Sequence, residues 1–120
     1  MPWTCRMAPD RDNAFGIGDM YFSVQFDAYH TAEFDRVLSP EYRRDWYGKR
    51  PPLFVITPDG PWCVDAVSTD GGGKNTNHGW TVTGKPPLIT ATPSINMVGK
   101  YHGWLTDGIL SDDLEGRTYP

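Results

Sequence analysis

Cysteine is scarce in this chain of 120 residues, with Cys5 and Cys63 as the two instances. No C-x-x-C spacing is present, so the sequence predicts neither a disulfide framework nor a zinc finger. Long apolar runs are also lacking, and no stretch approaches the roughly 20 residues that a membrane-spanning helix needs. The opening segment, MPWTCRMAPDRD, contains no apolar core of signal-peptide length. These absences predict a soluble cytoplasmic protein with reduced cysteines and no membrane partner.

Basic residues are outnumbered, since 11 Lys and Arg stand against 15 Asp and Glu, for a formal net charge of −4. Such a chain does not attract nucleic acid through its overall field. The segment SPEYRRDWYGKR interleaves basic and aromatic residues, as single-strand binding surfaces do, but Glu41 and Asp45 lie among them. The sequence therefore argues against nucleic acid as a partner, and no pattern in it predicts a cofactor.

Glycine and proline are abundant, with 13 and 11 residues, and aromatic residues make up 13% of the chain. This composition is typical of short strands joined by many turns and argues against a helical bundle. The length fits a single domain, residues 1–120. We expect the all-β class, as a small antiparallel barrel or sandwich with one short α-helix. We also expect an irregular N-terminal arm at 1–14, the helix at about 39–48 and a strand-rich C-terminal half at 78–114.

The helix is predicted by its end signals. Ser39 can cap the amino end, Pro40 fits the first helical position, and Gly48 can end the helix. Tyr42 and Trp46 are four residues apart and would share one face, which we expect to pack on the sheet.

A frame of the form His-Gly-Trp-x-x-x-Gly occurs twice, as HGWTVTG and as HGWLTDG. Two strands that each bury a tryptophan and stop at a turn explain it, with the glycine making room for the tryptophan ring. The alternative is a metal site that uses His78 and His102, with Asp107 or Asp112 as a carboxylate ligand. Metal sites need three or four ligands, and no H-x-H or H-x-x-x-H spacing supports this alternative.

The segment LITATPSINMVGKYHGWLT predicts an antiparallel hairpin that turns around Gly99. If the turn has three residues, Asn96 lies opposite His102, and Ser94 becomes a diagonal neighbour of His102 on one face, roughly 7 Å away. If the turn has two residues, His102 pairs with Ile95 instead and lies on the opposite face from Ser94. Whether Ser94 contacts His102 therefore depends on the length of the turn, because one residue more or less shifts the strand register and changes the face on which His102 lies.

A serine next to a histidine is the minimum for nucleophilic catalysis, because the imidazole removes the hydroxyl proton during attack. A carboxylate should orient the ring, and Asp107 is the nearest in sequence, with Asp112 and Asp113 after the next turn. Pro93 has no N–H to donate to a neighbouring strand, and proline is rare in central strands. We therefore expect an edge or a bulge at this position. Bulges can re-aim a functional side chain.

The C-terminal run from GWTVTGKPPLITATPSINMVGK to YHGWLTDGILSDDLEGRTYP resembles a family of unknown function that is common in bacteriophages of actinobacteria and other hosts. Phage genomes often label its members "ammonia monooxygenase". The likeness covers roughly residues 39–120, and a P-S-I…H-x-x-[LI]-x-[DN]-G core is its most specific part. Wider relatives resemble components of bacterial ubiquitin-like operons. That resemblance implies a peptidase with Ser94 as nucleophile and His102 as base. Many of those relatives have cysteine where this chain has Tyr101.

Two functions follow as expectations. The first is a phage accessory protein with a Ser/His hydrolase-like site, a peptidase or esterase, formed by Ser94, His102 and Asp107. The second is a non-catalytic interaction module or virion structural protein that uses the same β-face. The expected binding residues on that face are Asn96, Trp80, Trp104 and Tyr101. In either case the expected partner is a host or phage protein, met in the host cytoplasm or in the virion.

Overall fold

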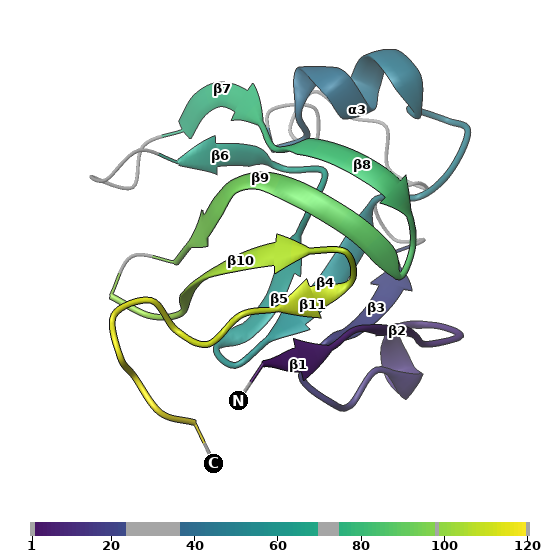
Figure 1. Ribbon diagram of the computed structural model, residues 1–120. Helices are drawn as coiled ribbons and strands as arrows, with labels where there is room; N and C mark the ends of the chain where they lie inside the picture. The colour runs from purple at the N-terminus through teal and green to yellow at the C-terminus, as the bar shows by residue number, and fades with distance from the viewer. Residues whose placement is uncertain (1, 24–36, 70–74, 98, 120) are drawn as a thin grey trace.

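The structure, a computed structural model, describes residues 2–23, 37–69, 75–97 and 99–119. Two antiparallel-rich sheets dominate it (Figure 1). The first has five strands in the spatial order β1 (Trp3–Thr4), β11 (Ile109–Leu110), β10 (His102–Thr106), β9 (Leu88–Asn96) and β8 (Thr81–Lys85). The second has four, in the order β2 (Arg6–Met7), β3 (Asp19–Phe22), β4 (Leu53–Thr57) and β5 (Gly60–Cys63).

A two-stranded pair, β6 (Val67–Thr69) and β7 (Asn75–Gly79), lies beside one α-helix, α3 (Pro40–Asp45), and a 3₁₀ turn spans Arg11–Asn13. Among the described strand pairings, β2 with β3 is parallel and the others are antiparallel. The prediction of an all-β fold with one short helix is confirmed. The sheets do not close into a barrel, and they stack as a sandwich.

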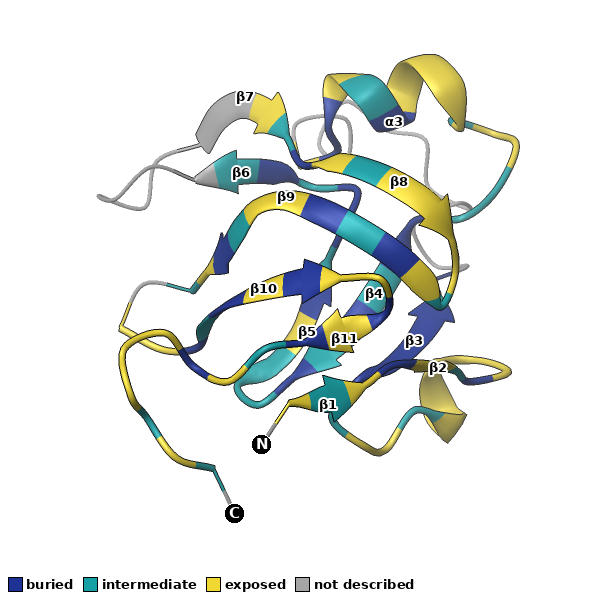
Figure 2. Cartoon of the chain, viewed as in Figure 1, coloured by how far each residue is buried: buried dark blue, intermediate teal, exposed yellow. Residues whose placement is uncertain are grey.

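The alternation of burial along the strands builds the core between the sheets (Figure 2). In β4, Leu53, Val55 and Thr57 are buried and the residues between them are half-buried. In β9 the buried positions Ile89 and Ala91 alternate with more exposed ones. Residues two apart on a strand share a face, so each sheet presents one apolar face to the other.

The helix begins where the sequence predicts. Ser39 accepts a hydrogen bond from the Tyr42 N–H through its side-chain oxygen (3.1 Å), and Pro40 occupies the first turn. Tyr42 is buried, as expected for the face that packs on the sheet, whereas Trp46 at the carboxyl cap remains partly exposed. The described part of the chain contains no helix long and apolar enough to cross a membrane.

The expectation of an irregular arm at 1–14 is wrong. This segment contains β1, which pairs with β11, and β2, which pairs with β3. The chain therefore passes from one sheet to the other within its first residues, at Cys5. Strands of two residues are too short to show a periodicity, so no pattern in the sequence predicts them.

Glycine in the repeated frame allows the backbone to pass close to other segments of the chain. A Cβ at Gly103 would collide with the ring of Tyr101 and come within 2.8 Å of the Ser111 hydroxyl. A Cβ at Gly79 would collide with Ser39 and lie 3.2 Å from the Ala66 carbonyl oxygen. The two glycines therefore make room for these neighbours.

Candidate active site

The turn between β9 and β10 fixes the register that the sequence left open. Asn96 pairs with His102, and the Met97 N–H donates to the Tyr101 carbonyl (2.9 Å). The three-residue alternative is therefore confirmed. Gly99 has a φ of 75°, a left-handed conformation that glycine adopts without a steric penalty.

A bulge follows two residues further along the hairpin. Gly103 pairs with Ile95, but Leu105 pairs with Ala91, so three residues of β9 lie opposite Trp104 alone. Pro93 is the middle one of the three, and the expected irregularity at this proline is confirmed. A bulge bends the strand and redirects its side chains, and here it carries Ser94.

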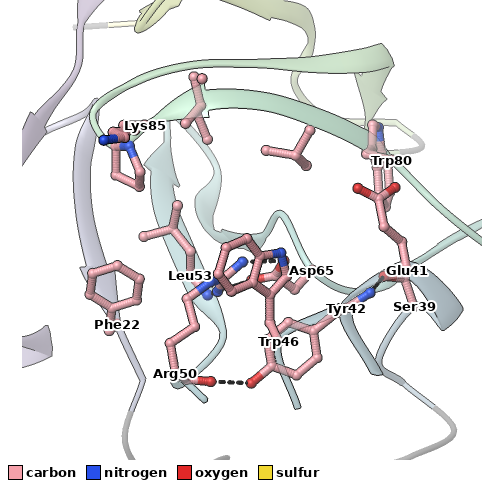
Figure 3. Close-up of a pocket in the computed structure, with 14 residues that line it drawn as sticks. Phe22, Ser39, Glu41, Tyr42, Trp46, Arg50, Leu53, Asp65, Trp80 and Lys85 are labelled. Carbon is pink, nitrogen blue, oxygen red and sulfur yellow. Dashed lines mark hydrogen bonds and ion pairs between the residues drawn. The ribbon is translucent and has the colours of Figure 1, made fainter. Parts of the chain in front are cut away.

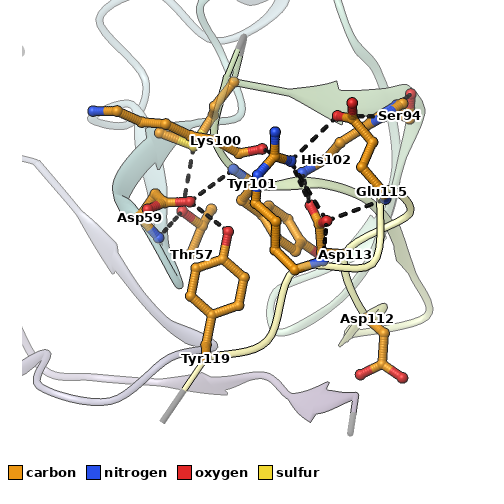
Figure 4. Close-up of polar contacts among 12 residues, drawn as sticks. Thr57, Asp59, Ser94, Lys100, Tyr101, His102, Asp112, Asp113, Glu115 and Tyr119 are labelled. Carbon is orange, nitrogen blue, oxygen red and sulfur yellow. Dashed lines mark hydrogen bonds and ion pairs between the residues drawn. The ribbon is translucent and has the colours of Figure 1, made fainter.

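Ser94 and His102 meet on the outer face of the five-stranded sheet. The Ser94 Oγ lies 3.1 Å from the His102 Nε2, within hydrogen-bond distance (Figure 4). The contact predicted from the three-residue turn is thus present. Both side chains are half-buried, and 26% of the His102 side chain is exposed, so the pair remains open to solvent on one side.

Glu115 lies on the other side of the imidazole. Its Oε2 is 3.6 Å from the His102 Nδ1, an ion-pair distance that is longer than a hydrogen bond. The same oxygen is 3.3 Å from the Arg117 Nη1. A carboxylate beside Nδ1 favours a proton on that nitrogen, which leaves the lone pair of Nε2 directed at the Ser94 hydroxyl.

Asp113 holds the tail that carries Glu115. Its carboxylate accepts hydrogen bonds from the backbone N–H groups of His102 (2.8 Å), Glu115 (3.1 Å) and Arg117 (2.9 Å). Burial alone would raise the pKa of Asp113, but the backbone hydrogen bonds from Arg117 and His102, together with the Arg117 charge, lower it. One ionised side chain therefore ties the start of β10 to the residue behind the ring.

Asp107 does not orient His102, contrary to expectation. It lies past the other end of β10, five residues along an extended strand, which is roughly 16 Å at 3.3 Å per residue. Its contacts are with Thr90, whose hydroxyl accepts from the Asp107 N–H (2.9 Å). Sequence reasoning missed Glu115 because a tail that folds back cannot be recognised from spacing. The acidic run DDLEGR after the last strand was the available signal.

The expected binding residues divide into two pairs. Asn96 and Trp104 are exposed, as a binding face requires. Tyr101 and Trp80 are buried, so their assignment to an exposed face is wrong. The Tyr101 hydroxyl donates to the Ser111 carbonyl (2.7 Å), and the Trp80 Nε1 donates to the Ser94 carbonyl (3.4 Å). These two buried side chains therefore hydrogen-bond to the backbone near the site and do not form part of an exposed binding face.

Trp104 borders a shallow groove of about 310 Å³ on the same sheet. The groove is also lined by Pro2, Thr106, Asp107, Ile109 and Ser111. Trp104 is two residues from His102 on the same outward face of β10, about 7 Å away along the strand. The groove therefore begins at the next outward-facing position of β10 after His102, and neither Ser94 nor His102 lines it.

The metal alternative finds no support in the part of the chain that the structure describes, where no three His, Cys, Asp or Glu side chains gather as a metal site would need. His78 belongs to β7 and His102 to β10, in different sheets. Comparison of the chain with protein families, with curated proteins and with solved structures found no match.

Proposed function

We propose that this protein is a serine hydrolase that cleaves an ester or amide bond, with Ser94 as nucleophile, His102 as general base and Glu115 as the residue that orients the ring. The observation that carries the proposal is the 3.1 Å contact from the Ser94 Oγ to the His102 Nε2, with a carboxylate 3.6 Å from the opposite ring nitrogen. The same order of contacts, serine to histidine to acid, recurs in catalytic triads on unrelated folds.

The chemistry follows from these positions. The Ser94 Oγ bonds to the carbonyl carbon of the substrate while its proton passes to the Nε2 of His102. The imidazolium is stabilised by Glu115 and then gives the proton to the leaving alcohol or amine as the carbon–leaving-group bond breaks. Water then attacks the acyl-serine, with His102 as base again, and this step releases the acid and restores Ser94.

The biological setting rests on the likeness of the PSINMVGKYHGWLTDG segment to the phage family. On that ground we place the protein among phage accessory proteins that act in the host cytoplasm, with a host or phage protein as substrate. A peptidase fits this setting better than an esterase, because a protein substrate offers amide bonds.

The test is labelling of the folded protein with a fluorophosphonate probe, which reacts with activated serine. We expect labelling of the wild type, none of Ser94→Ala or His102→Ala, and slower labelling of Glu115→Gln. The matched control is Thr92→Ala, which removes an exposed hydroxyl two residues from Ser94 on the same strand and should leave labelling intact. Circular dichroism confirms that each variant folds. An unlabelled wild type, or labelling that survives in Ser94→Ala, would refute the proposal.

A second candidate function, protein binding without catalysis, is favoured by a separate observation. Trp104 and Ile109 are exposed large apolar residues that flank one groove on the same sheet face. Exposed aromatic residues of this kind are enriched at the centres of interfaces. Binding is favoured over hydrolysis if the wild type does not react with the probe but captures a defined host or phage protein. Trp104→Ala should then no longer capture that protein.

A further inference from the structure

A second hollow lies between α3 and the strands β8 and β9, and neither Ser94 nor His102 lines it. Its volume is about 260 Å³. Four aromatic residues line it, namely Phe22, Tyr42, Trp46 and Trp80. Cavities of about 150 Å³ with apolar walls accept a benzene ring, so this one has room for two fused rings.

The charges inside this cavity are already paired. Arg50 and Asp65 form two hydrogen bonds, from Nη1 to Oδ2 (2.8 Å) and from Nη2 to Oδ1 (3.0 Å). Asp65 is buried and also accepts from the Leu53 N–H (2.8 Å). An unpaired buried charge would attract a counter-ion, but here each of the two charges neutralises the other. The Arg50–Asp65 pair therefore leaves no uncompensated charge in the cavity that would attract an ionic ligand.

The rim of the cavity carries one charge of each sign. Figure 3 shows Lys85 on the side of Phe22, and Glu41 on the opposite side, next to Trp80. An ion of either sign meets one attractive charge and one repulsive charge there, so the two rim charges together give no net attraction for ions. With no such attraction to offset the loss of hydration, the aromatic lining favours a neutral ligand.

Trp46 supplies a flat surface for such a ligand. The Arg50 guanidinium lies 5.0 Å from the centroid of the Trp46 ring, and this contact helps to hold the indole in place. Even so, 45% of Trp46 is exposed, which is high for a residue that lines a cavity. Val82 and Ile89 line the same cavity from β8 and β9. An aromatic ring can stack on an exposed indole, and aliphatic side chains complete an apolar slot.

We propose that this cavity binds one uncharged planar aromatic group of about the size of indole. The group belongs either to a free small molecule or to a side chain of a peptide. The proposal does not depend on Ser94 or on hydrolysis, since no residue of the cavity is the nucleophile, the base or the orienting acid.

The test is a titration of the ¹⁵N-labelled full chain with indole, followed by NMR of the tryptophan side-chain N–H signals. We expect Trp46 and Trp80 to shift, and affinity to fall at least tenfold in Val82→Phe, which fills the cavity, and in Trp46→Ala, which removes the stacking surface. Trp46 is partly exposed, so its variant tests the site even if Val82→Phe does not fold. The matched control is Trp104→Ala, which removes a tryptophan of similar exposure, 43%, from the other site.

Charged analogues test the claim that the bound group is uncharged. Indole-3-acetate and tryptamine should each bind at least tenfold more weakly than indole. N-acetyl-tryptophanamide, which is neutral, separates the sources: tighter binding than indole indicates a peptide side chain, and weaker binding indicates a free small molecule. The proposal is overturned if millimolar indole leaves Trp46 and Trp80 unshifted, if either ion binds as tightly as indole, or if Trp104→Ala weakens binding as much as Trp46→Ala.

Discussion

Gly103 occupies the position where β10 passes closest to buried neighbours. Any side chain there would press into the ring of Tyr101 and the hydroxyl of Ser111. Tyr101 is fully buried and held by its hydrogen bond to the Ser111 carbonyl, so it cannot swing away without leaving a buried hydroxyl unpaired. We expect Gly103→Ala to lower the free energy of unfolding by about 2–3 kcal/mol, measured by urea denaturation with tryptophan fluorescence.

The control for this substitution is Gly16→Ala. A Cβ there would meet the Asp19 carboxylate at 3.7 Å, an ordinary contact, and the backbone is not left-handed. Alanine at such a position leaves stability unchanged or raises it, because it restricts the unfolded chain. If both variants lost the same stability, the steric explanation for Gly103 would be wrong.

Asp113 gives the site a predictable response to acid. Its folded-state pKa is lowered, so its ionised form adds stability above the unfolded pKa of about 3.9, and this stability is lost as pH falls through the folded pKa. Asp113→Asn cannot be charged at any pH. We therefore expect the variant to be less stable than the wild type at about pH 7, and the gap to narrow as pH falls towards about pH 3.

Urea midpoints measured between these two pH values would test the prediction. Asp112→Asn makes the same chemical change one residue away at an exposed position, and it should produce a smaller gap. A gap for Asp113→Asn that widened on acidification would contradict the assignment of a lowered pKa.

At the scale of elements, α3 depends on its cap. Ser39 satisfies the Tyr42 N–H, one of the free donors at the amino end, and its own N–H donates to the Asp65 carbonyl (2.7 Å). Ser39→Ala keeps the second bond and loses the first. We expect a loss of about 1 kcal/mol in the free energy of unfolding. Urea denaturation gives the value. Glu41→Ala, which leaves the cap in place, should cost less, and equal losses would argue against a capping role.

Local signals account for the elements that the sequence predicted correctly. The capped helix, a turn around Gly99 and an irregularity at Pro93 each depend on residues that are neighbours in the chain. The contact of Ser94 with His102 follows from the last two, because a turn and a strand period together fix which side chains share a face. Spacing reduced this half of the site to two alternatives, a two-residue or a three-residue turn, and the observed register selects the second.

The other half depends on how distant segments meet. Asp107 is nearer to His102 in sequence than Glu115 is, but an extended strand carries it away. Glu115 returns because Asp113 gathers the N–H groups of the tail around one carboxylate. The pairing of β1 with β11 is non-local in the same way, since it joins the first strand to the last. No local pattern encodes such partners, so the orienting acid and the sheet order came from the structure alone.

At the scale of the whole molecule, contacts between distant segments fasten both ends of the chain. The Tyr119 hydroxyl donates to Asp59 (2.6 Å), and the same carboxylate oxygen accepts from the Tyr101 N–H (2.7 Å). Asp59 belongs to the turn between β4 and β5, so this bond ties the tail to the opposite sheet. At the other end, Cys5 lies where the chain crosses from β1 to β2 and packs in the shared core.

The position of Cys5 makes it a reporter for separation of the sheets. Burial raises the pKa of its thiol to about 11, so at about pH 8 roughly one molecule in a thousand carries the reactive thiolate. Burial also raises the pKa of Cys63. We expect iodoacetamide, followed by intact mass and peptide mapping, to alkylate Cys5 very slowly in the folded protein and rapidly in concentrated guanidinium.

The reaction at Cys5 should proceed through the open state, because β1 must leave β11 or β2 must leave β3 before the reagent can reach the sulfur. Its rate then follows the population of that state. A loss of about 2 kcal/mol raises this population roughly 30-fold, so Gly103→Ala should be alkylated at Cys5 about 30 times faster than the wild type. If Gly103→Ala lost that stability without any change in the rate at Cys5, the thiol would be reached by local fraying of the first strands. The crossing at Cys5 would then not be part of the cooperative core.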